Sequence, residues 1–215
     1  QTYQSWWGLP EDKLKTDRTW NYYTYDNETD NYQQDHYQLI YTGKVGSNWK
    51  TNLALHYTYG RGYYEQFRAD DEFGSYALAP VKIGDEMIER TDFIRRRWLD
   101  NDFYGFVGSV NYVSTDGKLD WIIGGGANRY DGGHFGEIIW AEFANGTAIR
   151  NRYYDNNGLK KDFNSYLKVD YAIAKKTTIF ADLQLRTVDY TAKGIDNNLA
   201  QIEVDTNFVF FNPKA

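Results

Sequence analysis

The sequence predicts an all-β protein, built as an antiparallel meander of β-hairpins. Stretches of roughly ten residues alternate between apolar and polar side chains, which is the period of a strand with two different faces. Short turns join these stretches in pairs, and aromatic residues, which favour strands, make up 18% of the chain. The expected elements are a loop at 1–34, a hairpin at 36–59, a loop at 60–98, a hairpin at 102–130, a loop at 131–161, a hairpin at 163–187, a loop at 188–202 and the start of a strand at 203–215.

The first hairpin, 36–59, shows the clearest alternation. Tyr37, Leu39 and Tyr41 would share one face of its first strand, and a tight turn follows at 45–48. The returning strand would place its apolar residues on the same face, namely Trp49, Leu53, Leu55, Tyr57 and Tyr59. Alternation of this length on both sides of a short turn is typical of a β-hairpin.

The next two hairpins repeat this pattern. In hairpin 102–130 Tyr104, Phe106, Val110 and Tyr112 would share a face, and a turn at 114–118 reverses the chain. In hairpin 163–187 the turn lies at 174–176, and the shared face would hold Leu167, Val169, Leu183 and Leu185. A seventh strand is expected to start near 204 and to be cut off at the end of the chain. The sequence thus predicts six strands and part of a seventh.

Connections of two lengths alternate along the chain, with tight turns at one end of the hairpins and long polar loops at the other. Loops longer than about 12–15 residues are uncommon in compact domains, but transmembrane β-barrels carry them on their extracellular side. A polar lumen would also accept the side chains expected on the second face, namely Gln38, Thr42, Asn52, His56, Lys168, Asp170, Asp182, Gln184 and Arg186. An open sheet exposes unpaired backbone groups to lipid, and the smallest bacterial single-chain barrels have eight strands. We therefore expect hairpins of a transmembrane β-barrel with long extracellular loops, as a slice of a larger barrel.

Composition excludes several classes of function. The net charge of −6 gives no basic field for nucleic acid, and the absence of cysteine rules out disulfides, thiolate metal sites and a cysteine nucleophile. The mean hydropathy is −0.73, and no apolar run approaches the roughly 20 residues of a membrane helix. A low average hydropathy is compatible with a membrane barrel, because only alternate strand residues face lipid.

Several segments resemble a known family of membrane proteins. They include LALHYTYGRGYYEQF (53–67) and TDFIRRRWLDNDFYG (91–105), together with 6–39, 128–143, 152–166 and 211–215. Together these segments are similar to the middle of the barrel of a TonB-dependent outer-membrane receptor, of the Bacteroidetes iron–siderophore type. The resemblance spans essentially the whole chain and identifies the family better than the ligand.

The resemblance implies a plugged barrel of 22 strands in the bacterial outer membrane. It implies uptake of a ferric siderophore, haem or cobalamin, energised by the TonB complex through the plug domain. The expected partners are TonB, a small metal chelate and outer-membrane lipid, with no cofactor and no catalytic residues. Because plug, TonB-interacting segment and closing strand are not recognisable, we expect this chain to carry barrel wall and outer vestibule alone.

Candidate ligand-binding residues come from the expected outer loops and the lumen. Arg95, Arg96 and Arg97 could grip an anionic ligand, or they could bind lipopolysaccharide phosphates or pair with nearby aspartates. Aromatic residues crowd the same loops, where they could recognise a ring-bearing or sugar-like ligand or could pack the loops together. This crowd comprises Trp6, Trp7, Tyr22, Tyr23, Tyr63, Tyr64, Trp140, Tyr153 and Tyr154. The residues we expect at a ligand are Trp6, Trp7, His56, Tyr63, Tyr64, Arg95, Arg96, Arg97 and Trp140.

Two metal sites are conceivable, and each has a simpler interpretation. His36 and His56 would lie nearly opposite each other if the hairpin is centred on 46–47, but hydrogen bonding in a polar lumen explains both. Zn²⁺ also prefers three or four protein ligands. The segment 26–31 resembles an EF-hand loop, yet Asn31 stands where glycine is needed and Tyr37 where glutamate is needed. An irregular calcium site there stays open, beside a solvated acidic loop.

Two other classes of function remain as alternatives. An outer-membrane hydrolase barrel would need a nucleophile activated by a base. The base could come from His36 or His56 with Asp100 or Asp102, but no motif places a serine beside them. A soluble β-sandwich that binds a ligand or carbohydrate would have to cover the apolar faces, by pairing of two copies for example. Solubility as a folded monomer without detergent would favour the sandwich.

Overall fold

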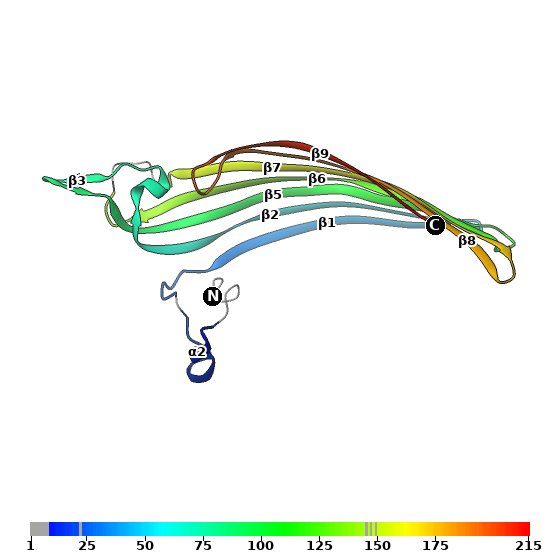
Figure 1. Ribbon diagram of the computed structural model, residues 1–215, viewed down its shortest axis with the longest axis horizontal. Helices are drawn as coiled ribbons and strands as arrows, with labels where there is room; N and C mark the ends of the chain where they lie inside the picture. The colour runs from blue at the N-terminus through cyan, green and yellow to red at the C-terminus, as the bar shows by residue number, and fades with distance from the viewer. Residues whose placement is uncertain (1–8, 22, 145, 147, 149) are drawn as a thin grey trace.

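The computed structural model describes residues 9–21, 23–144, 146, 148 and 150–215, and its main feature is one antiparallel sheet. The seven strands pair in chain order, each antiparallel to the next, so the predicted all-β meander is confirmed. Figure 1 shows them as a long, curved sheet. The strands are β1 (Asp30–Val45), β2 (Trp49–Glu72), β5 (Arg90–Val113), β6 (Leu119–Ala141), β7 (Arg152–Ala174), β8 (Thr177–Ile195) and β9 (Gln201–Lys214).

Four small elements complete the described fold. The strands β3 (Val81–Ile83) and β4 (Glu86–Ile88) form a hairpin that projects beyond one end of the sheet (Figure 1). The 3₁₀-helix η1 (Phe73–Tyr76) follows β2 directly. The helix α2 (Glu11–Thr16) lies in the N-terminal segment, below β1 in Figure 1 and near the same end of the sheet.

All three tight turns lie at the other end of the sheet. They connect β1 to β2, β5 to β6 and β7 to β8, as the sequence predicts. Gly46 and Gly117 take φ angles of 61° and 70° in two of them, a left-handed conformation that glycine adopts without steric cost. We call this the turn end, and we call the opposite end, which carries the N-terminal segment and the connections 73–89, 142–151 and 196–200, the loop end.

The predicted loop boundaries are wrong for much of their length, because the strands continue toward the loop end. The expected loop 60–98 is strand up to Glu72 and again from Arg90, and it also contains η1 and the β3–β4 hairpin. The expected loops 131–161 and 188–202 shrink to 142–151 and 196–200, and β1 begins at Asp30 within the expected loop 1–34. Polar and aromatic side chains occupy both faces of these extensions, so the alternation of apolar and polar residues stops there. The backbone ladder nevertheless continues.

The register gives the sheet two distinct faces. Leu53 lies opposite Gly108 and Leu55 opposite Phe106, so the apolar residues of successive strands share one side, which we call the apolar face. Large side chains that this face leaves exposed are Tyr37, Leu39, Tyr41, Trp49, Leu53, Leu55, Tyr57, Tyr104, Phe106, Ile123, Phe163, Leu167, Tyr171, Ile179, Leu183, Leu185, Val209 and Phe211. Within the described residues no second sheet covers them.

Aromatic rows border this apolar band on both sides. At the turn end the ring of Trp49 lies 4.7 Å from Tyr112 and 5.5 Å from Trp121, between ring centroids. Toward the loop end Tyr37 and Tyr57 stack at 6.0 Å, and Tyr104 pairs with Tyr57 on the next strand. The two rows are therefore separated by the same number of residues on β2 and on β5.

The opposite side, which we call the polar face, satisfies its side chains by cross-strand hydrogen bonds and ion pairs. Pairs on this face are His36–Thr58, Thr42–Asn52, His56–Asn128, Asn111–Asp120, Lys168–Asp182 and Arg186–Asp162. This face also carries exposed apolar side chains, namely Ile40 of β1, Phe103 and Val107 of β5, Phe180 of β8, and Phe208 and Phe210 of β9. The two faces therefore differ in the cross-strand hydrogen bonds and ion pairs of the polar face, and both expose some apolar side chains.

The fold's buried apolar cluster lies at the loop end. Phe73 and Tyr76 of η1 pack against Phe93 of β5 and against Tyr153 and Tyr154 of β7. Leu78, Val81, Ile88, Ile138, Ala141, Phe143 and Leu199 pack around this cluster. The longer connections therefore fold back onto the sheet and form a small protein core there.

Candidate functional site

The three consecutive arginines of β5 divide between the two faces, because side chains alternate along a strand. Arg95 and Arg97 lie on the polar face, whereas Arg96 lies on the apolar face with Glu65 and Trp98. Tyr63 and Tyr64 divide in the same way: Tyr63 lies under the guanidinium of Arg96, 4.2 Å from the ring centroid. The predicted arginine and tyrosine sites are therefore two different environments.

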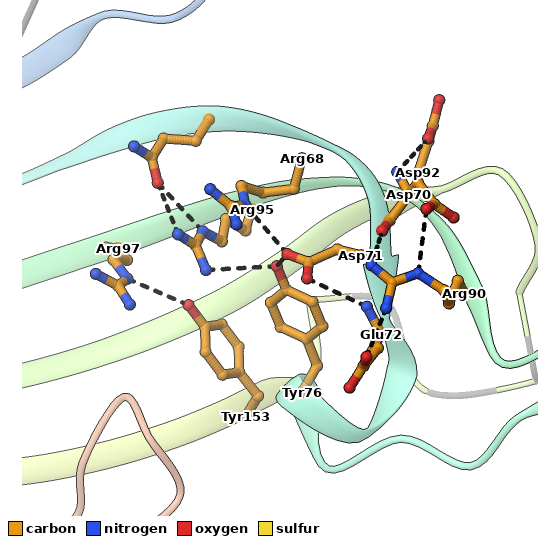
Figure 2. A network of polar contacts seen from close by, with 11 residues as sticks. Arg68, Asp70, Asp71, Glu72, Tyr76, Arg90, Asp92, Arg95, Arg97 and Tyr153 are labelled. Atoms are coloured by element: carbon orange, nitrogen blue, oxygen red, sulfur yellow. Dashed lines mark hydrogen bonds and ion pairs between the residues drawn. The ribbon is translucent and has the colours of Figure 1, made fainter. Parts of the chain in front are cut away.

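Arg97 is held by tyrosine hydroxyls on the polar face. Its Nη1 donates to the hydroxyl of Tyr64 at 2.9 Å, and its Nε donates to Tyr153 at 3.5 Å, as Figure 2 shows for Tyr153. The ring of Tyr154 lies 6.0 Å from the guanidinium carbon. Burial lowers the pKa of Arg97, but the hydrogen bonds to Tyr153 and Tyr64 outweigh burial and raise the pKa above its ordinary value.

Arg95 lies beside Arg97 and faces the core cluster. It donates to Gln66 at 2.9 Å and to the hydroxyl of Tyr76 at 3.4 Å, and that hydroxyl donates in turn to Asp71 at 2.8 Å (Figure 2). Burial and the hydrogen bond to Asp71 raise the pKa of Tyr76 to about 12, although Arg95 opposes them. Tyr76 therefore connects the apolar cluster to the arginines.

A cavity of about 390 Å³ opens beside Arg97. This volume is in the range of small-molecule sites. Its lining combines polar-face residues, Asn197 of the loop between β8 and β9, and the apolar-face positions Tyr63 and Trp98. The polar-face residues of the lining are Asp30, Tyr32, Gly62, Tyr64, Arg97, Leu99, His134 and Tyr154. Aromatic rings, one guanidinium and one imidazole thus converge on one space.

Two groups in this lining keep their neutral forms near neutral pH. Burial lowers the pKa of His134, so its imidazole is uncharged. Burial also raises the pKa of the Tyr154 hydroxyl. The positive charge of the cavity therefore comes from Arg97.

On the apolar face at the loop end, Glu65 anchors the N-terminal segment. Its side chain is 2% exposed and accepts hydrogen bonds from Tyr25 at 2.6 Å, Asn27 at 2.7 Å and Arg96 at 2.7 Å. Burial raises the pKa of Glu65, but these three hydrogen bonds outweigh burial and hold the pKa below its usual range. Asn27, from the segment weighed as a calcium loop, is thus engaged with Glu65.

Other predicted ligand residues do not reach this cavity. His56 lies in the middle of the sheet, where its Nε2 is 2.8 Å from Asn128 Oδ1. Trp140 lies opposite Ile94 on the apolar face and is 46% exposed. Trp6, Trp7 and Tyr22 lie outside the described residues.

The two histidines considered as a metal pair are out of register, and the simpler interpretation, separate hydrogen bonds, agrees with the structure. The hairpin is centred on Ser47, so His36 lies opposite Thr58 and His56 opposite Gln38. Each histidine has its own hydrogen-bond partner. Among the described residues no group of three or more His, Cys, Asp or Glu side chains could hold a metal ion.

Four residues of this region escaped the sequence-based interpretation. Tyr32, Tyr76 and His134 reach the Arg97 region from β1, η1 and β6, and Glu65 anchors the segment before β1. For Glu65 a signal existed: continuing the alternation of β2 past Tyr59 places it on the apolar face, where a lone carboxylate needs a partner. For Tyr76 no sequence pattern gives the position, because a 3₁₀-helix delivers it.

No family model matches the sequence, and no curated protein matches it. Within the described part of the chain, none of the helices has the length and apolar character to span a bilayer.

Proposed function

We propose that this chain forms part of the wall and outer vestibule of a transmembrane β-barrel in the bacterial outer membrane. We further propose that the barrel is a TonB-dependent uptake receptor for a ferric siderophore or a related haem or cobalamin ligand. The observation that carries the first proposal is the exposed apolar band, bordered by aromatic rows and backed by a polar face. The second proposal rests on the sequence resemblance and on the cavity at the loop end.

The height of the apolar band supports a bilayer as its environment. The stretch of β2 from one aromatic row to the other, Trp49 to Tyr57, is nine residues long, counting both ends. The corresponding stretch of β5, Tyr104 to Tyr112, has the same length. A transmembrane strand needs about 9–11 residues. Between the rows Leu53, Leu55 and Phe106 are 41%, 43% and 44% exposed. Contact of such an apolar surface with water is unfavourable, whereas lipid chains would cover it.

The difference between the two ends of the sheet supports one orientation of the sheet in the membrane. Short turns at one end and longer, protein-covered extensions at the other are the arrangement of outer-membrane barrels, with the turns in the periplasm. The cavity next to Arg97 would then open in the outer vestibule, above the membrane. Its tyrosines and arginine offer ring contacts and charge to a ligand captured from outside.

Refolding experiments test the membrane proposal. We expect the chain to aggregate in plain buffer and to become β-rich in detergent or lipid vesicles. Lipids brominated on their acyl chains should quench tryptophan fluorescence, and Trp49→Phe or Trp121→Phe should remove part of that quenching. The control is Trp98→Phe at the loop end, which should leave the quenching by lipid unchanged.

A stable, compact monomer in buffer that unfolds cooperatively would contradict the membrane proposal. It would favour the soluble β-sandwich that binds a ligand or carbohydrate, with the apolar face covered by other means. For the receptor proposal, cells producing the complete protein should accumulate labelled ferric chelate, and dissipating the proton-motive force should stop that uptake. Uptake that continues without the proton-motive force would contradict TonB coupling.

A further inference from the structure

Arg97 is a partly buried cation whose hydrogen bonds go to neutral groups. The described residues accept two hydrogen bonds from it, and both acceptors are tyrosine hydroxyls. Its Nη2 group donates to none of the described residues, and no carboxylate lies within ion-pair distance of the guanidinium. An arginine offers five N–H donors in a planar fork, so Arg97 keeps donor capacity beside the cavity.

Most other arginines of the sheet pair with a carboxylate. Arg96 pairs with Glu65 at 2.7 Å, Arg61 pairs with Asp100 at 3.2 Å, and Arg186 pairs with Asp162. A charge removed from water without a counter-ion is unfavourable. Arg95 also has no carboxylate partner among the described residues, but it donates to Gln66 and to Tyr76 and does not line the cavity. Arg97 is therefore the arginine of the cavity lining, and its positive charge lacks an anion.

The acids nearest to the cavity do not fill this role. Asp30 lines the cavity from β1, two strands away from β5, but its side chain is exposed and forms no ion pair with Arg97. Asp71 accepts the hydrogen bond of Tyr76 and pairs with Arg68 at 3.0 Å. The positive charge of Arg97 thus remains available to a bound molecule.

The other lining residues indicate which chemical groups a bound ligand would carry besides its negative charge. Tyr64 and Tyr154 present aromatic rings next to Arg97, and His134 adds an uncharged imidazole. Aromatic rings pack well against flat rings, in offset or edge-to-face arrangements. The fork of a guanidinium matches a carboxylate, which accepts two parallel hydrogen bonds from it.

We infer that this cavity binds a small organic anion that carries a flat ring, of the aromatic carboxylate class. The carboxylate would accept hydrogen bonds from Arg97, and the ring would lie against Tyr64 and Tyr154. This inference deepens the proposed function, since the cavity would then be a ligand site of the outer vestibule. The binding itself depends on the fold of the loop end and can be measured separately from membrane insertion.

Two probes of equal shape test the charge requirement. Benzoate carries the carboxylate, whereas benzamide is its neutral counterpart, and inorganic phosphate is an anion without a ring. With the full chain in detergent micelles, saturation-transfer NMR should detect benzoate binding at least about tenfold tighter than benzamide or phosphate, because charge-assisted hydrogen bonds are roughly twice as strong as neutral ones. Equal binding of benzoate and benzamide would overturn the inference.

Variants locate the binding site. Arg97→Gln should weaken benzoate binding at least about tenfold, and Arg97→Lys, which keeps the charge but loses the fork, should weaken it less. The matched control is Arg61→Gln, which removes an equal charge from the apolar face and should leave binding unchanged. If benzoate binds equally to the wild type and to both Arg97 variants, the assigned site is wrong.

The outcomes also separate this inference from the proposed function. Benzoate binding that depends on Arg97 supports the site even if the chain fails to insert into vesicles. Insertion into vesicles without any preference for benzoate leaves the membrane proposal standing and overturns the site.

Discussion

The two halves of the same strands are built differently. Toward the turn end, the sheet presents exposed apolar side chains on one face, and on the other it presents hydrogen-bonded polar side chains beside some exposed apolar ones, without a buried core. Toward the loop end, the strands are covered by η1, by the connection between β6 and β7 and by the N-terminal segment. The loop end therefore holds a protein core of its own, whereas the apolar band depends on its surroundings for burial.

A continuous β-ladder can therefore run through two environments. The backbone pairing of β2 and β5 continues from Trp49 to Glu72, with one register shift between Arg68 and Asp71. What changes along the ladder is the partner of the side chains, from surrounding solvent or lipid to other segments of the chain. Substitutions in the two halves should therefore respond differently to detergent and lipid.

Removing a ring from the core cluster should have the largest effect. Phe93 is 0% exposed and packs edge-on against Phe73, with 5.3 Å between the ring centroids. We expect Phe93→Ala to lower the free energy of unfolding by about 3–5 kcal/mol, because it leaves a cavity that neighbours fill only in part. Denaturant unfolding in detergent micelles measures this change.

The matched control is Phe106→Ala in the apolar band of the same strand. Phe106 is 44% exposed, so detergent can occupy the space that its ring leaves and the loss should be clearly smaller. Equal losses of stability for the two variants would show that both halves of the strand are buried alike. They would contradict an apolar band that depends on its surroundings for burial.

A charge placed in the middle of the apolar band should have the next largest effect. We expect Leu53→Arg to reduce the stability of the lipid-inserted state by about 2–4 kcal/mol, the range known for arginine at the midplane of a barrel. The neighbouring Asn52 points to the polar face, and Asn52→Arg should cost little. Unfolding from lipid vesicles compares the two variants. Equal costs would contradict a lipid-facing assignment of the apolar face.

At the loop end, removing the charge of Glu65, which anchors the N-terminal segment, should have a smaller effect on stability than the substitutions above. Glu65→Gln keeps the shape but leaves Arg96 without its counter-ion, and Arg96 is 19% exposed. We expect a loss of about 1–3 kcal/mol, below that for a fully buried pair. Limited proteolysis should then cut the segment 20–29 sooner, whereas the control Glu203→Gln, in an exposed pair with Lys193, should change nothing. Unchanged proteolysis in Glu65→Gln would contradict an anchoring role.

The same contrast explains which features the sequence could predict. Alternation is visible where one face is apolar, so hairpins, tight turns and the two faces of the band follow from residues such as Leu53, Leu55 and Phe106. At the loop end the faces are both covered by side chains of mixed polarity, and strand extensions through Arg61 or Arg97 look like loops. Alternation extended by a few residues would have separated Arg96 from Arg95 and Arg97.

The rest of the site depends on tertiary contacts. Tyr76 reaches Arg95 only because η1 folds back onto the sheet, and the β8–β9 loop brings Asn197 to the cavity. The offset of His36 from His56 depends on where the turn is centred, and a shift of one residue in a turn moves every pair of the hairpin. Sequence patterns fix neither of these placements.

Acidification should produce the smallest effect, a local release of the N-terminal segment. Because the folded pKa of Glu65 lies below its unfolded value of about 4.3, its stabilising contribution is fully present above that pH and is lost as the pH falls through the folded pKa. Glu28 acts in the opposite sense, since burial raises its pKa and it takes up a proton first. Cleavage of the segment 20–29 by pepsin should therefore accelerate well below pH 4, with the core cluster still intact. Glu65→Gln should lose this dependence, and a wild-type segment that stays protected at pH 2 would show that other contacts hold it.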